Sequence, residues 1–126
     1  MKVLNINKDE YKYIKELEEK KYVYYARIHE KIDKDELDLK CMLLLQRGTL
    51  KIIKYNLDET EWLGNTLIYY KSIDLINTII TSTRNILTVQ VNASKIYLEF
   101  NDKIVMHEFY KELTRLTNNQ KQRRFL

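Results

Sequence analysis

The segment 95–116 constrains the fold more than any other part of the sequence. Residues 95–100 alternate strictly, so that Ile96, Leu98 and Phe100 would share one side of an extended strand. After Asn101 and Asp102, apolar residues recur at spacings of three and four, which is typical of one face of a helix: Val105, Phe109, Leu113 and Leu116. A strand that leads directly into an amphipathic helix predicts a C-terminal helix packed on a sheet.

Other segments rich in β-branched, aromatic and alternating apolar residues indicate further strands. The predicted strands span residues 21–29, 37–46, 50–55, 66–70, 72–80, 86–91 and 95–100. Arg47 and Gly48 predict a tight hairpin turn, because glycine tolerates the left-handed conformation that such turns need. Residues 58–65 are acidic, contain Trp62 and Gly64, and are predicted to form a loop.

The sequence predicts a first helix at residues 8–20. Asn7 followed by Glu10 resembles a capping box, in which the two side chains satisfy free backbone N–H groups at the start of a helix. Ile14 and Leu17 give this helix only a narrow apolar stripe. We therefore expect it to pack at an edge of the sheet.

These elements predict an α+β domain. It would contain a small bent antiparallel sheet, or a partly open barrel, of about seven strands, with the C-terminal helix plugging one mouth. The length of 126 residues suits one domain covering residues 1–126, whose basic segment 118–126 we expect to be a frayed tail. The sequence lacks the long apolar run of a transmembrane helix or a signal peptide, so the cytoplasm is the expected compartment.

The order of these elements resembles the pleckstrin-homology-like (PH-like) superfold, in particular its small bacterial members. The resemblance covers residues 22–116, and its local features are the run Tyr70-Lys71-Ser72-Ile73-Asp74 and the passage from strand to helix over residues 100–113. It implies a scaffold that binds a protein or peptide, and in some members an anionic lipid head group. The additional first helix leaves two other folds open, an RNA-binding pseudobarrel of the PUA type and a cystatin-like sheet wrapped on one helix.

Residues suited to catalysis are sparse and scattered. Cys41 is the single cysteine and lies between Leu39 and Leu43 on an apolar strand face, which predicts a buried, inert thiol. His29 and His107 have no metal-ligand spacing to each other or to Cys41, so each is predicted to be a satisfied surface or edge histidine. The acidic cluster around residues 33–38 is interleaved with lysine, as in a solvated turn. We therefore expect no enzyme activity, no cofactor and no metal site.

Basic residues suggest one candidate surface. The net charge of +4 resides after Glu112, since the chain up to that residue has as many basic as acidic side chains. Between residues 39 and 57 the sequence has cations and no acid, which predicts a local patch able to bind an anionic group or a nucleic acid. The candidates there and in the tail are Lys40, Arg47, Lys51, Lys54, Arg123 and Arg124.

Tyrosines suggest a second candidate surface. The chain has 10 of them, and aromatic rings on a sheet beside lysines are used by single-stranded RNA binders to stack bases. The candidate stacking residues are Tyr22, Tyr24, Tyr69 and Tyr97. Two hypotheses follow: a non-catalytic PH-like module that binds a protein or peptide, and a small RNA-binding regulator of a bacterial, phage or plasmid genome. The neutral charge of the body favours the first.

Overall fold

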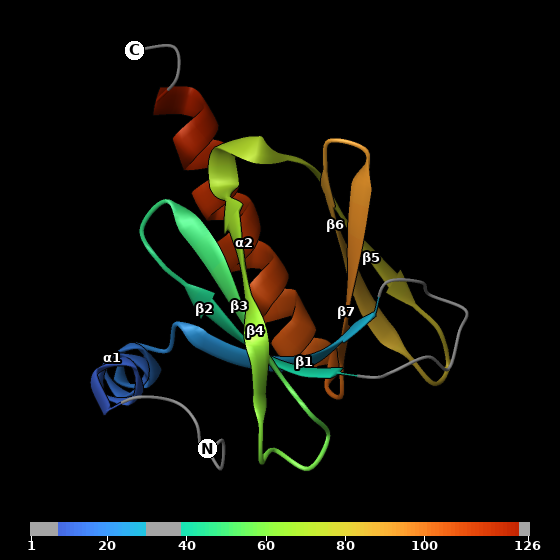
Figure 1. Cartoon of the computed structure of the whole chain (residues 1–126). Coiled ribbons are helices and arrows are strands. Elements are labelled where there is room, and N and C mark those ends of the chain that lie inside the picture. Colours follow the sequence, from blue (N-terminus) through green and yellow to red (C-terminus); the bar gives the residue numbers. More distant parts are fainter. Residues whose placement is uncertain (1–7, 30–38, 124–126) are drawn as a thin grey trace.

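The computed structural model describes residues 8–29 and 39–123, with the side chains described up to residue 121. Two helices and an antiparallel sheet of seven strands make an α+β fold, as the sequence predicts (Figure 1). The elements are α1 (Lys8–Glu19), β1 (Val23–His29), β2 (Leu39–Leu45), β3 (Thr49–Tyr55), β4 (Trp62–Tyr69), a 3-10 turn η1 (Tyr70–Ser72), β5 (Ile73–Ile80), β6 (Asn85–Val91), β7 (Ser94–Phe100) and α2 (Lys103–Arg123).

The sheet is two antiparallel meanders joined at one place. Its strand order is β4-β3-β2-β1-β7-β6-β5, so consecutive strands are neighbours everywhere except where β1 pairs with β7. Among the described strands β4 and β5 are the two edges, and the sheet is therefore open. The predicted bent, partly open arrangement is confirmed, and the described strands do not close into a barrel.

The predicted loop at residues 58–65 is wrong over its second half, because β4 already begins at Trp62. The turn before it is compact, since the Asn56 side-chain oxygen accepts hydrogen bonds from the backbone N–H groups of Thr60 and Glu61 at 2.9 and 3.0 Å. Gly64 lies within β4 at a φ of 128°, opposite a register shift in β3. Glycine and acidic residues are typical of loops, so the sequence pattern did not reveal this irregular start of β4.

Helix α2 continues to Arg123, beyond the apolar periodicity that ends at Leu116. Its start is fixed by Asp102, whose carboxylate accepts the backbone N–H of Ile104 at 2.8 Å. No glycine or proline follows Leu116 to end the helix, and Thr117 is buried in its next turn. The helical part of the predicted tail, residues 118–123, thus extends α2.

The main core lies between α2 and the inner face of the sheet. Met106, Phe109 and Leu113 of α2 are fully buried against inward-facing residues of both meanders. The ring of Phe109 lies 5.0 Å from that of Tyr24 on β1 and 5.6 Å from that of Phe100 on β7, measured between centroids. Figure 1 shows α2 lying between the two halves of the sheet, which it holds together.

Helix α1 covers the outer face of the first meander. Its buried residues Ile14 and Leu17 pack with Met42, Leu44, Ile53 and Tyr55, which are set on the opposite face of β2 and β3 from the main core. The prediction that α1 packs at a sheet edge is therefore wrong, because β2 and β3 are interior strands. Two buried side chains are enough to attach α1 to the sheet, because β2 and β3 supply the other residues of this second core.

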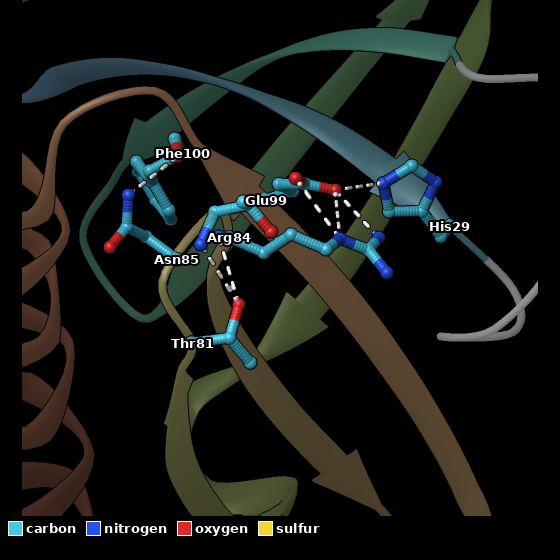
Figure 2. Close-up of polar contacts among 7 residues, drawn as sticks. His29, Thr81, Arg84, Asn85, Glu99 and Phe100 are labelled. Atoms are coloured by element: carbon cyan, nitrogen blue, oxygen red, sulfur yellow. Dashed lines mark hydrogen bonds and ion pairs between the residues drawn. The ribbon is translucent and has the colours of Figure 1, made fainter.

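The junction of the two meanders is short and reinforced by charge. The ladder between β1 and β7 covers the pairs Arg27/Glu99, Ile28/Leu98 and His29/Tyr97. Beside it, the Nε–H of Arg84 is shared between the two carboxylate oxygens of Glu99, at 3.2 Å from each, and Nη2 donates to one of them at 2.7 Å. The His29 imidazole lies 2.9 Å from the same carboxylate (Figure 2). Contacts from His29 on β1 and from Arg84, the residue before β6, thus meet on the Glu99 side chain of β7.

We expect Phe109→Ala to lower the free energy of unfolding by about 3–5 kcal/mol, because it empties a fully buried site between α2 and both meanders. Thermal and denaturant unfolding would measure this loss. Ile104→Ala on the same helix is the matched control, since Ile104 is 69% exposed and should change stability little. An unchanged melting temperature for Phe109→Ala would contradict the proposed role of α2.

Glu99→Gln should reduce the free energy of unfolding by about 1.5–3 kcal/mol near neutral pH, the range for hydrogen bonds to a charged group. The Arg84 hydrogen bonds hold the pKa of the Glu99 carboxyl below its ordinary value of 4.5, against the opposing effect of burial. Because the pKa is lowered by folding, this stabilisation is complete above pH 4.5 and is lost as pH falls through the folded-state pKa.

Unfolding curves recorded from neutral to acidic pH would check the prediction for Glu99. The wild type and Glu99→Gln should differ most at neutral pH and converge in acid. Glu16→Gln, on an exposed position of α1, is the control and should leave the curves unchanged. A difference between wild type and Glu99→Gln that is constant across this range would show that the carboxylate charge is not what stabilises the junction.

Candidate functional site

A groove runs between the edge strand β5 and the C-terminal half of α2. It has a volume of about 150 Å³. One wall is the first half of β5, and the other is a polar stripe of α2 beside the apolar stripe that packs on the sheet. We call it the edge groove, and its lining residues are Ile73, Asp74, Leu75 and Ile76 on β5 and Tyr110, Thr114, Thr117, Asn118 and Lys121 on α2.

Two hydroxyl groups in the helical wall have no hydrogen-bond partner among the described residues. They are the Oγ1 atoms of Thr114 and Thr117, both shielded from solvent. Thr117 as a whole is 5% exposed. Leaving a buried hydroxyl unsatisfied costs about 1–3 kcal/mol, so such groups are normally bonded. Two of them belong to the lining residues of one groove, which makes the edge groove a candidate binding surface.

The strand wall offers backbone groups along its free edge. Within the described part of the chain β5 pairs with β6 alone, and its other side faces the edge groove. An edge strand presents a row of unpaired N–H and C=O groups, which an extended chain can pair with. The groove thus combines a template for a new strand with hydroxyl groups placed beside it.

The edge groove contains two charged side chains, Asp74 and Lys121, and their interactions with the rest of the protein differ. The Asp74 carboxylate accepts the backbone N–H of Asn92 at 2.7 Å, which ties the start of β5 to the turn between β6 and β7. Lys121 lies at the other end of the lining and forms no ion pair with another described residue. Lys121 could therefore engage an acidic group of a ligand.

The predicted basic patch is not a free cationic surface. Lys40 lies 3.4 Å from the Glu59 carboxylate, and Lys51 lies 2.9 Å from that of Glu10 on α1. Lys51 pairs with Leu44 and Lys54 with Cys41, which belong to opposite faces of the sheet. Arg47 is exposed at the hairpin turn. The structure thus separates the cations that the sequence places together.

The two tail candidates add no described side chain to that patch. Arg123 is the last residue of α2, and its side chain is not described; Arg124 lies outside the described residues. The acidic cluster predicted around residues 33–38 and the capping residue Asn7 also lie outside them.

The four candidate stacking tyrosines do not share a surface. Tyr24 points into the main core, where its ring contacts Phe109. Tyr22 precedes β1, Tyr69 is 54% exposed on the edge strand β4, and Tyr97 lies on β7, separated from β4 by three strands. Base stacking along a strand of RNA needs neighbouring rings on one face. These positions do not provide it.

The residues considered for catalysis are buried or engaged. Cys41 is fully buried in the main core, and burial raises the pKa of its thiol to about 12, so the thiol stays protonated. His29 is 6% exposed and bound to Glu99, so it is a buried rather than a surface histidine. His107 is half-buried on α2. Among the described residues no three His, Cys, Asp or Glu side chains are grouped to hold a metal ion.

Sequence reasoning did not find the residues of the edge groove, although a signal was present. Positions 110, 114, 117 and 121 recur at helical spacing just beside the apolar stripe of α2, and all carry polar or amphipathic side chains. Polar residues next to a buried stripe are usually solvent-facing. Only the position of β5 makes this stripe the wall of a groove.

Comparisons with protein-family models and with curated proteins find no match to this chain. In the described part of the chain, neither helix has the length and apolar character needed to cross a membrane.

Proposed function

We propose that this protein is a non-catalytic interaction module that binds an extended segment of a protein or peptide partner in the edge groove. The observation that carries the proposal is the pair of shielded threonine hydroxyls, Thr114 and Thr117, beside the open edge of β5. A partner strand would pair with the β5 backbone and offer its own polar groups to these hydroxyls. This is recognition by strand addition, with side-chain specificity supplied by the helix.

The PH-like resemblance is part of this proposal. Seven antiparallel strands followed by a C-terminal helix, in the sheet order β4-β3-β2-β1-β7-β6-β5, are consistent with it. The absence of a catalytic role is also proposed, and it is supported by the burial of Cys41 and by the engagement of His29 with Glu99.

The alternative, an RNA-binding regulator, is less well supported. Affinity for RNA grows with the number of phosphates that cations neutralise, and two of the hairpin candidates are already paired with Glu10 and Glu59. The candidate tyrosines are dispersed over several strands. We expect weak or no binding of mixed single-stranded RNA at physiological salt.

The proposal predicts that peptides selected from a random library on the immobilised full chain bind the edge groove. Thr117→Val keeps the side-chain shape but removes the hydroxyl, and should weaken such a peptide by about two- to tenfold, the worth of one neutral hydrogen bond. Lys121→Glu should weaken peptides that carry an acidic residue. Fluorescence anisotropy of the labelled peptide would measure both effects.

Two control variants distinguish binding in the edge groove from binding elsewhere on the surface. Thr83→Val changes an exposed threonine in the turn between β5 and β6, and Lys111→Glu reverses an exposed charge on another face of α2. Neither should alter affinity. Equal affinity of Thr117→Val, Lys121→Glu and the wild type would refute the edge groove as the site.

The same protein titrated with mixed single-stranded RNA tests the alternative. Sub-micromolar binding that falls steeply with salt, and falls further when Lys51, Lys54, Arg123 and Arg124 are replaced by alanine, would favour the regulator instead.

A further inference from the structure

The edge strand β4 presents a row of backbone groups that the described part of the chain does not pair. The Tyr70 N–H donates to the Gly48 carbonyl at 3.2 Å, so the backbone of Tyr70 points towards β3. In an antiparallel ladder, consecutive residues point alternately to the two sides of the strand. Asn65, Leu67 and Tyr69 therefore direct their N–H and C=O groups away from β3, to the side where no described strand lies. We call these three residues the free edge of β4.

The free edge lacks the features that usually keep edge strands from pairing. Such strands are commonly protected by charged residues, proline or bulges. Residues 62–70 include no charged residue and no proline, and the irregularity at Gly64 precedes the free edge. Leu67 and Tyr69 are each 54% exposed, and Leu63 is 47% exposed. Apolar side chains and open backbone groups thus coincide on β4, as they do on a surface that pairs with another strand.

The charges at the two ends of β4 match those of a second copy of the same strand. Glu61 precedes the uncharged stretch and Lys71 follows it; both are exposed, and neither forms an ion pair with another described residue. Two identical strands that pair about a two-fold axis run antiparallel, so the start of each lies beside the end of the other. Since Glu61 and Lys71 are equally far from Thr66 in the sequence, a two-fold axis at Thr66 sets each Glu61 opposite the Lys71 of the other copy. Unlike charges opposite each other stabilise a strand pair, and like charges destabilise it.

The same register suits the backbone and the apolar side chains. It places Asn65 opposite Leu67 of the other copy, and both belong to the free edge, so their N–H and C=O groups can bond to each other. Leu63 then lies opposite Tyr69, and the two copies of Leu67 are diagonal neighbours, within reach of each other. Charge, hydrogen bonding and apolar contact therefore agree on one register of β4 with itself.

The other edge strand does not offer this match. The sequence is also uncharged between Asp74, at the start of β5, and Arg84, in the turn after it. However, Asp74 accepts the backbone N–H of Asn92, and Arg84 binds Glu99. The charges at the ends of β5 are thus engaged within the chain, whereas those at the ends of β4 are available to a partner.

We propose that the protein forms a two-fold symmetric dimer in which the β4 strands of two copies pair antiparallel and join the two sheets into one. A second copy is the occupant because its Glu61 and Lys71 complement those of the first in the register that also pairs the free edges. Since β5 is at the opposite end of each sheet, both edge grooves remain open in the dimer. The dimer does not depend on the function proposed for those grooves.

Analytical ultracentrifugation of the full chain over a range of concentrations tests for the dimer. We expect a reversible equilibrium between monomer and dimer. Leu67→Lys should weaken the dimer at least about tenfold, because it places two ammonium groups beside the two-fold axis. Ile79→Lys adds the same charge to a 38% exposed position on β5 and should leave the dimer unchanged. A chain that stays monomeric at the highest concentration reached, or a dimer that Leu67→Lys leaves intact, would overturn the proposal.

A charge exchange tests the identity of the partner and the register. Glu61→Lys and Lys71→Glu should each weaken the dimer about three- to tenfold, because either change sets like charges opposite each other at both symmetric positions. The double variant restores unlike pairs and should regain the affinity of the wild type. Both positions are exposed, so none of these variants should alter the fold. If the double variant dimerises no better than the single ones, the proposed register is refuted.

Amide hydrogen exchange tests whether the β4 backbone forms the contact. The N–H groups of Asn65, Leu67 and Tyr69 should exchange more slowly as the protein concentration rises, because dimerisation protects them. The amides of β5 are the control, and their exchange should not depend on concentration. A dimer in which the three β4 amides exchange at the same rate at every concentration would place the contact elsewhere and contradict the proposal.

Discussion

The pairing of β1 with β7 is the interaction on which the rest of the structure depends. It is the only strand pairing between the two meanders in the described part of the chain, and it covers three residue pairs. Such a short ladder needs support from both sides of the sheet. On the inner side, Phe109 contacts Tyr24 of β1 and Phe100 of β7. On the outer side, Glu99 binds Arg84 and His29. The core and the ion pairs thus reinforce the same joint.

The shortness of this junction also leaves a hollow of about 650 Å³ beside residues 23–26 of β1. Had the ladder continued past Glu99, β7 would have covered residues 23–26 of β1; instead the chain turns at Asn101 and Asp102 and begins α2. The same helix passes along the inner face and leaves the first half of β5 uncovered on its other flank.

Much of the fold was predictable because local patterns decide it. The alternation in residues 95–100 and the helical spacing after Asp102 place β7, α2 and the buried Phe109, and Cys41 lies on the core face that its neighbours indicate. The predictions that were wrong concern features that depend on residues distant in the sequence or on an irregular strand. Gly64 and the Asn56 turn concealed the start of β4, and α1 covers interior strands because Met42 and Ile53 complete a core that its own thin stripe does not reveal.

The candidate sites were less predictable, since charge acts through space. Residues 39–57 contain no acid, yet Glu59 and Glu10 reach Lys40 and Lys51 from other elements. The reverse holds for the edge groove, whose threonines would count as ordinary helix-surface residues until β5 is placed beside them. A hydroxyl group lowers the stability of the fold when folding removes its water without supplying a hydrogen-bond partner. Whether this happens depends on how α2 and β5 pack together, which the sequence of α2 alone does not show. For this reason the proposed function rests on the shielded hydroxyls of Thr114 and Thr117 and not on a run of charge in the sequence.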